Sequence, residues 1–188
     1  WFFHTPGLKI VYPSTASDAK GLLNAAIEDP NPYLFFEHKA LYRSHSEKIF
    51  NDYYTTEVGK ARVVTSGDDM TIVTYGMGVY WATKASEKFN NISIEVIDLR
   101  TLQPWDKETV EESIKKTNKV IILHEDCITG GIGAEISAWI SEKCFESLDG
   151  PILRAGGLDT PVPFRKELEE NFMPAERLHD QILRLSKY

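Results

Sequence analysis

Hydrophobic and polar positions follow one another in blocks that predict strands and helices in regular succession. The apolar run Leu8–Tyr12, which a proline stops, is typical of a strand. Apolar residues at helical spacing follow in Leu22–Ile27, and the prolines within 29–32 end this helix because proline lacks the backbone N–H. The next apolar run, Tyr33–Phe36, completes a strand–helix–strand unit, which is typical of a parallel sheet.

The same alternation resumes after residue 60 and continues to the end of the chain. Strands that alternate with helical stretches indicate a doubly wound α/β fold, with a mostly parallel sheet and helices on both faces. The expected strands are 62–64, 71–75, 92–99, 120–123 and 151–154, and the expected helices are 77–89, 106–116, 130–144, 167–171 and 176–185.

The stretch between these two parts, residues 43–60, is polar and shows neither the spacing of apolar residues typical of a helix nor the alternation typical of a strand. A structureless segment of this length is uncommon inside a compact domain and is typical of a linker between domains. The sequence therefore predicts an N-terminal unit over residues 1–42, a linker over 43–60 and a C-terminal domain over 61–188.

Composition narrows the class of protein. The chain is 42% hydrophobic, which excludes disorder as its main state, and its net charge of −7 provides no basic stripe for nucleic acid. No apolar run approaches the roughly 18 residues that span a bilayer.

Cys127 and Cys144 form neither a disulfide framework nor a metal spacing, which favours a reducing compartment. The start at Trp1, without an initiator Met, suggests a piece of a longer polypeptide.

Two short motifs offer candidate chemistry, and each has a structural alternative. The run Gly130–Gly133 lies between a strand and a helix, where backbone N–H groups can bind a phosphate, or where glycines simply permit a tight turn and close packing. The pair His124-Glu125 ends a buried strand, where it can act as an acid–base pair or can fix a loop or line a contact. The structural alternative is favoured for both.

The segment from Asp98 to Asp106 follows another strand and is interpreted as structural. Asp98 and Arg100 are close enough in sequence to pair, Asp106 is suited to cap the next helix, and Trp105 is rigid and apolar beside a proline. Catalytic signatures such as Gly-x-Ser-x-Gly or a zinc spacing do not occur. By itself, this pattern predicts a fold but no chemistry.

The ordered set of motifs resembles the β subunit of thiamine-diphosphate-dependent 2-oxo acid dehydrogenases over essentially the whole chain. Any one motif can arise by chance, whereas the set in order is specific. The motifs are His4–Ser14, Asp18–Leu23, Ile27–Pro32, Phe35–Glu37, Gly59–Ala61, Val96–Asp106, His124-Glu125, Thr129–Ile136 and Asp159–Pro161.

The resemblance implies a fold and an activity. Residues 1–42 are similar to the end of the domain that binds the pyrimidine of thiamine diphosphate, and residues 61–188 to the three-layer α/β/α transketolase C-terminal domain. Enzymes of this family decarboxylate a 2-oxo acid and pass the acyl group to a lipoyl carrier. Their catalytic His and activating Glu lie upstream of Trp1, and the positions for Mg²⁺ and diphosphate are also absent, so we expect no catalytic residue here and no activity of this chain alone.

One ion site can be carried over from the family. Backbone oxygens at positions matching Ala26, Asp29 and Asn31 hold potassium in some members, and spare carbonyls at a helix C-terminus suit a cation. Ordinary capping by Asn31 is the alternative. The resemblance places the intact enzyme in the bacterial cytoplasm or the mitochondrial matrix.

Substrate and partners follow less directly from the resemblance. The stretch 35–43, with Arg100-Thr101 and Pro104–Asp106, is more similar to the branched-chain (2-oxoisovalerate) members than to the pyruvate or acetoin members. The family implies a homodimer or an α2β2 assembly and a lipoyl-bearing acyltransferase, without nucleic acid or membrane. A non-catalytic assembly module is the alternative from another class, and a transketolase or deoxyxylulose-phosphate synthase is less similar.

Two interaction surfaces are expected. Trp139 and Ile140, on the helix after the glycines, offer apolar area for self-association. The terminal carboxylate of Tyr188 is the candidate docking point for a basic domain of the acyltransferase, with acidic residues nearby. These acids are Glu167, Glu169, Glu170, Glu176 and Asp180.

Overall fold

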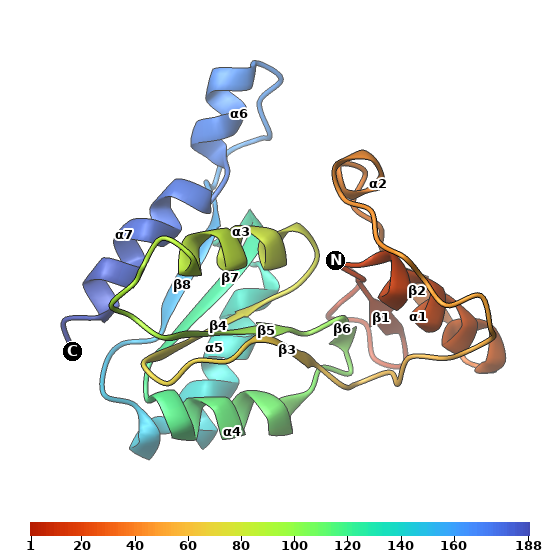
Figure 1. The fold of residues 1–188 in the computed structure, drawn as a ribbon, viewed down its shortest axis with the longest axis horizontal. Helices are drawn as coiled ribbons and strands as arrows, with labels where there is room; N and C mark the ends of the chain where they lie inside the picture. The colour runs from red at the N-terminus through yellow and green to blue at the C-terminus, as the bar shows by residue number, and fades with distance from the viewer.

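The structure, a computed structural model, describes residues 1–188 and contains a small and a large sheet (Figure 1). In the small sheet, β1 (Lys9–Val11), α1 (Ala16–Glu28) and β2 (Tyr33–Phe35) form the predicted strand–helix–strand unit, with β1 and β2 parallel. Thr15 caps α1 by accepting a hydrogen bond from the backbone amide of Asp18. The N-terminal unit therefore follows the sequence pattern closely.

A third strand joins the small sheet from a distant part of the chain. β6 (Thr101–Gln103) pairs antiparallel with β1, so that Ile10 lies opposite Gln103 and Val11 opposite Thr101. The sequence predicts no strand there, because three residues are too few to show a period. The C-terminal part of the chain thus completes the sheet of the N-terminal unit.

The large sheet has the strand order β3-β5-β4-β7-β8. All its strands are parallel except β3, which runs antiparallel to β5. β3 and β4 follow one another in the chain but do not pair, because β5 lies between them. The strands are β3 (Arg62–Thr65), β4 (Met70–Thr74), β5 (Ile94–Asp98), β7 (Val120–Cys127) and β8 (Leu153–Gly157).

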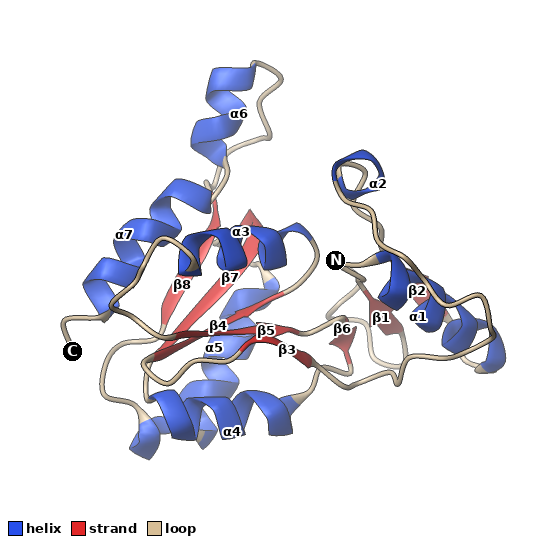
Figure 2. Cartoon of the chain, in the orientation of Figure 1, coloured by secondary structure: helices blue, strands red, loops and turns tan.

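Helices cover both faces of this sheet and make the expected three-layer α/β/α architecture (Figure 2). α3 and α7 pack on one face and α4 and α5 on the other, while α6 stands away from the sheet on a projecting arm. None of the helices is long and apolar enough to cross a membrane. The helices are α3 (Met77–Ser86), α4 (Lys107–Thr117), α5 (Ile132–Lys143), α6 (Lys166–Phe172) and α7 (Ala175–Leu185), with a 3-10 turn at Phe145–Ser147.

Strand β7 shows why two cores form. Its successive side chains point to opposite faces. Val120 and Ile122 therefore pack with α4 and α5, whereas Ile121 and Leu123 pack with α3 and α7. A strand buried on both faces is a continuous apolar run, as the sequence predicts here.

The segment between the two sheets crosses α1. It begins with the short helix α2 (Leu41–Ser44), and residues 45–56, which we call the strap, have no regular structure. The ammonium group of Lys20 on α1 donates to the carbonyl oxygens of Phe50, Asn51 and Asp52 at 2.5, 3.2 and 2.9 Å. The strap is thus irregular in backbone but attached to α1.

Candidate functional site

His124 lies near the carboxyl end of β7, at the sheet edge where open α/β folds bind ligands. Its side chain is fully buried, with Nδ1 2.9 Å from the carbonyl oxygen of Asp126 and no partner for Nε2. The contact with a carbonyl assigns the proton to Nδ1, and burial lowers the pKa of His124. This geometry makes His124 a neutral packing residue rather than an accessible acid or base.

Glycines surround the His124 ring. A Cβ added at Gly131, Gly133 or Gly156 would lie within 3.0 Å of an imidazole atom. Gly130, with φ +77°, takes a backbone conformation that other residues rarely adopt. The geometry favours the packing role of the glycine run over the phosphate-binding role.

Glu125 has a different partner from its neighbour. Its Oε2 atom lies 2.8 Å from Nε2 of His38, which follows β2 in the N-terminal unit. Tyr12 is close to this pair, and burial together with the Glu125 carboxylate raises the pKa of Tyr12 to about 12. His124 and Glu125 are therefore not an acid–base pair: one fixes a loop, and the other lines the junction between the two units. The contribution of His38 has no signal in the sequence, since it comes from a distant segment.

A cavity of about 930 Å³ lies at this junction and is the first candidate site. Both units line it, and aromatic side chains dominate its wall. The ring of Tyr12 stacks on Phe36 at 5.9 Å and contacts Tyr75 at 5.2 Å, while Trp105 and the backbone of Gly130 complete the wall. Such a surface suits an apolar partner with a few polar contacts.

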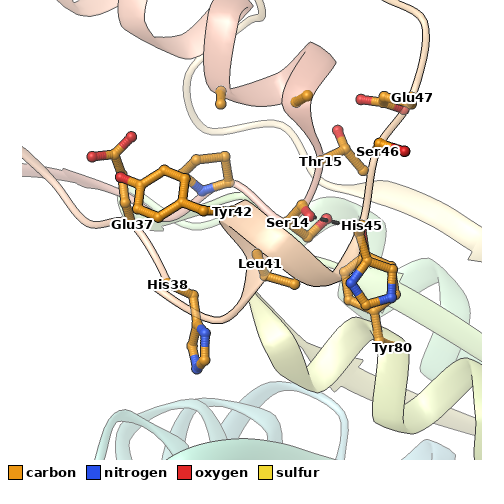
Figure 3. Close-up of a pocket in the computed structure, with 13 residues that line it drawn as sticks. Ser14, Thr15, Glu37, His38, Leu41, Tyr42, His45, Ser46, Glu47 and Tyr80 are labelled. Carbon is orange, nitrogen blue, oxygen red and sulfur yellow. Dashed lines mark hydrogen bonds between the residues drawn. The ribbon is translucent and has the colours of Figure 1, made fainter.

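A second cavity, of about 400 Å³, lies beside the N-terminus of α1 (Figure 3). The His45 ring lies over Tyr80 of α3 at 3.6 Å between centroids. The Glu47 carboxylate accepts from the amide of Ser17 at 2.5 Å and thereby occupies the positive end of the α1 dipole. This cavity also has walls from both units, because Tyr80 belongs to the large-sheet domain and the remaining lining residues to the segment before it.

In the segment after β5, the side chain of Arg100 contacts Asp18 of α1. The guanidinium group of Arg100 bonds Asp18 at 3.0 Å, and only its backbone N–H reaches Asp98. Asp98 and Arg100 therefore pair through the Arg100 backbone and not as an ion pair of side chains, because the Arg100 side chain extends toward Asp18 of α1. Asp106 is confirmed as the cap of α4, since it accepts from the amide of Thr109 at 3.1 Å.

The candidate potassium site lies at the end of α1. The Asp29 carboxylate there accepts hydrogen bonds from Lys9, from Asn31 at 2.6 and 2.9 Å, and from the Tyr33 hydroxyl at 2.9 Å. The Lys9 ammonium and the two Asn31 N–H donors hold the pKa of Asp29 well below its usual range. Because this carboxylate already has a cationic partner, a potassium ion would depend on the backbone oxygens of Ala26, Asp29 and Asn31.

The expected interaction surfaces differ in exposure. Ile140 is fully buried in the core of its own chain, and Trp139 packs edge-on against Trp105 at 5.0 Å. Ile140 therefore cannot contribute to a self-association face, whereas Trp139 is half-buried and its part in such a face stays a prediction. Tyr188 is 59% exposed, and the acidic residues proposed to accompany it lie on α6 and α7 and are exposed.

No group of three or more His, Cys, Asp or Glu side chains comes close enough to hold a metal ion. Mg²⁺ bound with a diphosphate prefers carboxylate and other oxygen ligands. We therefore assign no residue of this chain to such a group.

Two domain families match the chain in sequence. The family described as "Transketolase, C-terminal domain" matches residues 59–177, and "Transketolase, pyrimidine binding domain" matches residues 1–45. A solved structure described as "Split gene transketolase, inactive beta4 tetramer" is similar in fold, with a TM-score of 0.77 over 97% of this chain and 58% of that chain, at 24% identity.

Curated relatives are similar over most of the chain. The 2-oxoisovalerate dehydrogenase subunit beta of Dictyostelium discoideum is 51% identical over 87% of this chain and 45% of its own length. The 2-oxoisovalerate dehydrogenase subunit beta of Bacillus subtilis is 47% identical over 92% of this chain and 54% of its own length. The pyruvate dehydrogenase E1 component subunit beta of Rhizobium meliloti is 43% identical over 93% of this chain and 38% of its own length. The chain thus spans about half the length of the relatives that it matches.

Proposed function

The chain belongs to the transketolase C-terminal domain family and is homologous to β subunits of 2-oxo acid dehydrogenases, and from this premise we propose that it is part of the decarboxylating component of such a complex. The observation that carries the proposal is the order of two family matches along one chain, pyrimidine-binding then C-terminal domain, in a chain 43–51% identical to named β subunits.

The whole enzyme would bind thiamine diphosphate, which would supply the chemistry that decarboxylates the 2-oxo acid. The residues of this chain would serve it in other ways. They would keep the large-sheet domain against the pyrimidine-binding unit and provide assembly surface. This division into residues 1–42, 43–60 and 61–188 is itself part of the proposal. No catalytic role is proposed for His4, His38 or His124.

Branched-chain 2-oxo acids are the proposed substrates. The support is the higher identity to two 2-oxoisovalerate dehydrogenase subunits than to the pyruvate one, together with the stretch 35–43. The test is the kcat/KM of the full-length assembled enzyme for 3-methyl-2-oxobutanoate and for pyruvate. A ratio above about ten supports the proposal, and a ratio below one replaces it with a pyruvate or acetoin dehydrogenase.

The partners follow from the same family. We propose an assembly with a separate or fused α subunit, α2β2 or homodimeric in form, and docking of the lipoyl acyltransferase at the Tyr188 carboxylate. The compartment would be the bacterial cytoplasm or the mitochondrial matrix, as the names of the relatives suggest.

A structural potassium ion at Ala26, Asp29 and Asn31 is a further part of the proposal. Its support is the C-terminus of α1, which presents unbonded carbonyl groups. Thermal unfolding of the full-length protein in potassium and in tetramethylammonium buffers tests it. A higher Tm in potassium at equal ionic strength is expected, and equal values would remove the ion from the account.

A non-catalytic assembly module is the second candidate. Its support is that neither histidine at the junction is a free acid or base, since His124 is buried and His38 lies against Glu125. Pull-down of the acyltransferase by this chain, with no turnover by the full-length protein, would favour the module over the enzyme subunit.

A further inference from the structure

Four charged side chains from both units meet at one place beside α1. Asp18 comes from α1, Arg62 from β3, and Asp98 and Arg100 from the end of β5. Their formal charges cancel. The side chains of Asp18 and Asp98 are only 8% and 0% exposed, so this is a buried ion cluster.

Arg100 makes several hydrogen bonds in addition to its ion pair with Asp18. Its guanidinium group donates to Asp18 at 3.0 Å, to the carbonyl oxygen of Lys60 at 2.8 and 3.1 Å, and to that of Ala61 at 3.2 Å. Its own carbonyl oxygen accepts from the amide of Tyr12 at 2.8 Å. One residue thus contacts α1, the end of β1 and the segment that enters the large sheet.

The Arg100 backbone conformation points to the same role. Its φ of +57° lies in the left-handed region, which is unfavourable for a non-glycine residue. Such a conformation persists only where surrounding contacts over-determine it. Here the contacts to Asp18, Lys60 and Tyr12 provide that constraint.

Asp98 completes the connection from the large-sheet domain. Its carboxylate accepts from the Ser14 hydroxyl at 2.5 Å, from Arg62 at 3.1 Å and from the Arg100 amide at 3.1 Å. Ser14 belongs to the loop between β1 and α1. Both carboxylate oxygens of Asp98 therefore accept hydrogen bonds at this junction.

We propose that the cluster of Asp18, Arg62, Asp98 and Arg100 is a latch that fixes the N-terminal unit and the large-sheet domain in one orientation. The desolvation cost of buried ion pairs offsets much of their attraction, so their net stabilisation is small. Rotation of one unit against the other would, however, break the pairs of Asp18 with Arg62 and Arg100 and the bond from Ser14 to Asp98 together. The latch therefore selects an orientation more than it adds stability.

Both cavities depend on that orientation. The larger one has walls from Tyr12 and Phe36 on one side and Tyr75 and Trp105 on the other, and the smaller one is closed by Tyr80. The strap contacts the large-sheet domain through His45, which lies over Tyr80, whereas its hydrogen bonds from Lys20 attach it to α1. This inference is independent of the substrate and of the proposed function.

Hydrogen exchange with mass spectrometry on the full-length protein tests the latch. The variants are Arg100→Met and Asp18→Asn. Asp18→Asn keeps the shape of the side chain and removes its charge. It therefore tests the latch even where Arg100→Met does not fold. We expect exchange in peptides covering residues 9–12 to accelerate at least tenfold, and exchange in 70–74 to change less than threefold. Local opening of one cooperative unit produces this pattern.

Glu95→Gln is the matched control. Glu95 is equally buried and pairs with Lys116, but both residues belong to the large-sheet domain. This variant should accelerate exchange in 70–74 at least as much as in 9–12. Equal acceleration of both peptides in Asp18→Asn, or no acceleration in either, would overturn the latch.

Discussion

The His124 imidazole lies against the backbone of Gly133, so that a Cβ on this glycine would come within 2.5 Å of Nε2. The strand end and the first turn of α5 thereby approach more closely than any side chain at residue 133 permits. Close packing of this kind leaves little room for relaxation, because protein interiors are already dense.

Gly133→Ala should therefore lower the free energy of unfolding by about 1–3 kcal/mol, the usual cost of overpacking. Urea unfolding at pH 7.5 measures it. In a His124→Ala background the cost of the same substitution should shrink, because the colliding ring is absent. An equal cost in both backgrounds would show that His124 is not the obstacle.

The free energy of unfolding should fall as the pH is lowered below about 6.5, the ordinary pKa of histidine. Burial lowers the pKa of His124 in the folded state, so the unfolded chain binds a proton that the folded chain does not. The free energy of unfolding then decreases as pH falls from 6.5 toward the folded pKa, by up to about 1 kcal/mol at pH 5.5. Unfolding at pH 7.5 and 5.5 should differ less in His124→Asn than in the natural sequence. Equal differences would assign the effect to other groups.

Limited proteolysis should cut the chain first between Tyr42 and Ala61, where the strap lacks regular structure. Lys20→Met removes the ammonium group that three strap carbonyls share, and cleavage should accelerate several-fold. Lys115→Met is the control, because Lys115 pairs only with Glu111 of its own helix. First cleavage within 70–160, or equal acceleration by both variants, would contradict this role of the strap.

Under the proposed function, docking of the lipoyl acyltransferase should depend on the Tyr188 carboxylate. Removal of Lys187 and Tyr188 shifts that carboxylate and should raise the dissociation constant at low salt, and added salt should weaken binding to the natural sequence by screening. Titrations of the acyltransferase's peripheral domain at two salt concentrations measure both effects. Equal affinity in all four titrations would exclude this docking mode.

Local pattern predicts most elements of the fold but not the contacts between the two units. The apolar run Val120–Leu123 predicts β7, and Asp106 predicts the start of α4, because both signals are contained in neighbouring residues. β6 has no such signal, since its partner is β1 of the other unit.

The candidate site shows the same limit. His124 and Glu125 are adjacent in sequence, but their partners are set by the fold: a carbonyl two residues away for one, and His38, 87 residues away, for the other. The family resemblance implies an activity, whereas only the folded structure shows that the Arg100 guanidinium group contacts Asp18 and not Asp98.

Decarboxylation of a 2-oxo acid, followed with an artificial electron acceptor, tests the central claim most directly. The full-length protein, assembled with its α partner, should turn over 3-methyl-2-oxobutanoate or pyruvate only when thiamine diphosphate and Mg²⁺ are present. The 188-residue chain alone should show no turnover under the same conditions. Turnover by the chain alone, or none by the assembled full-length protein with either substrate, would contradict the account.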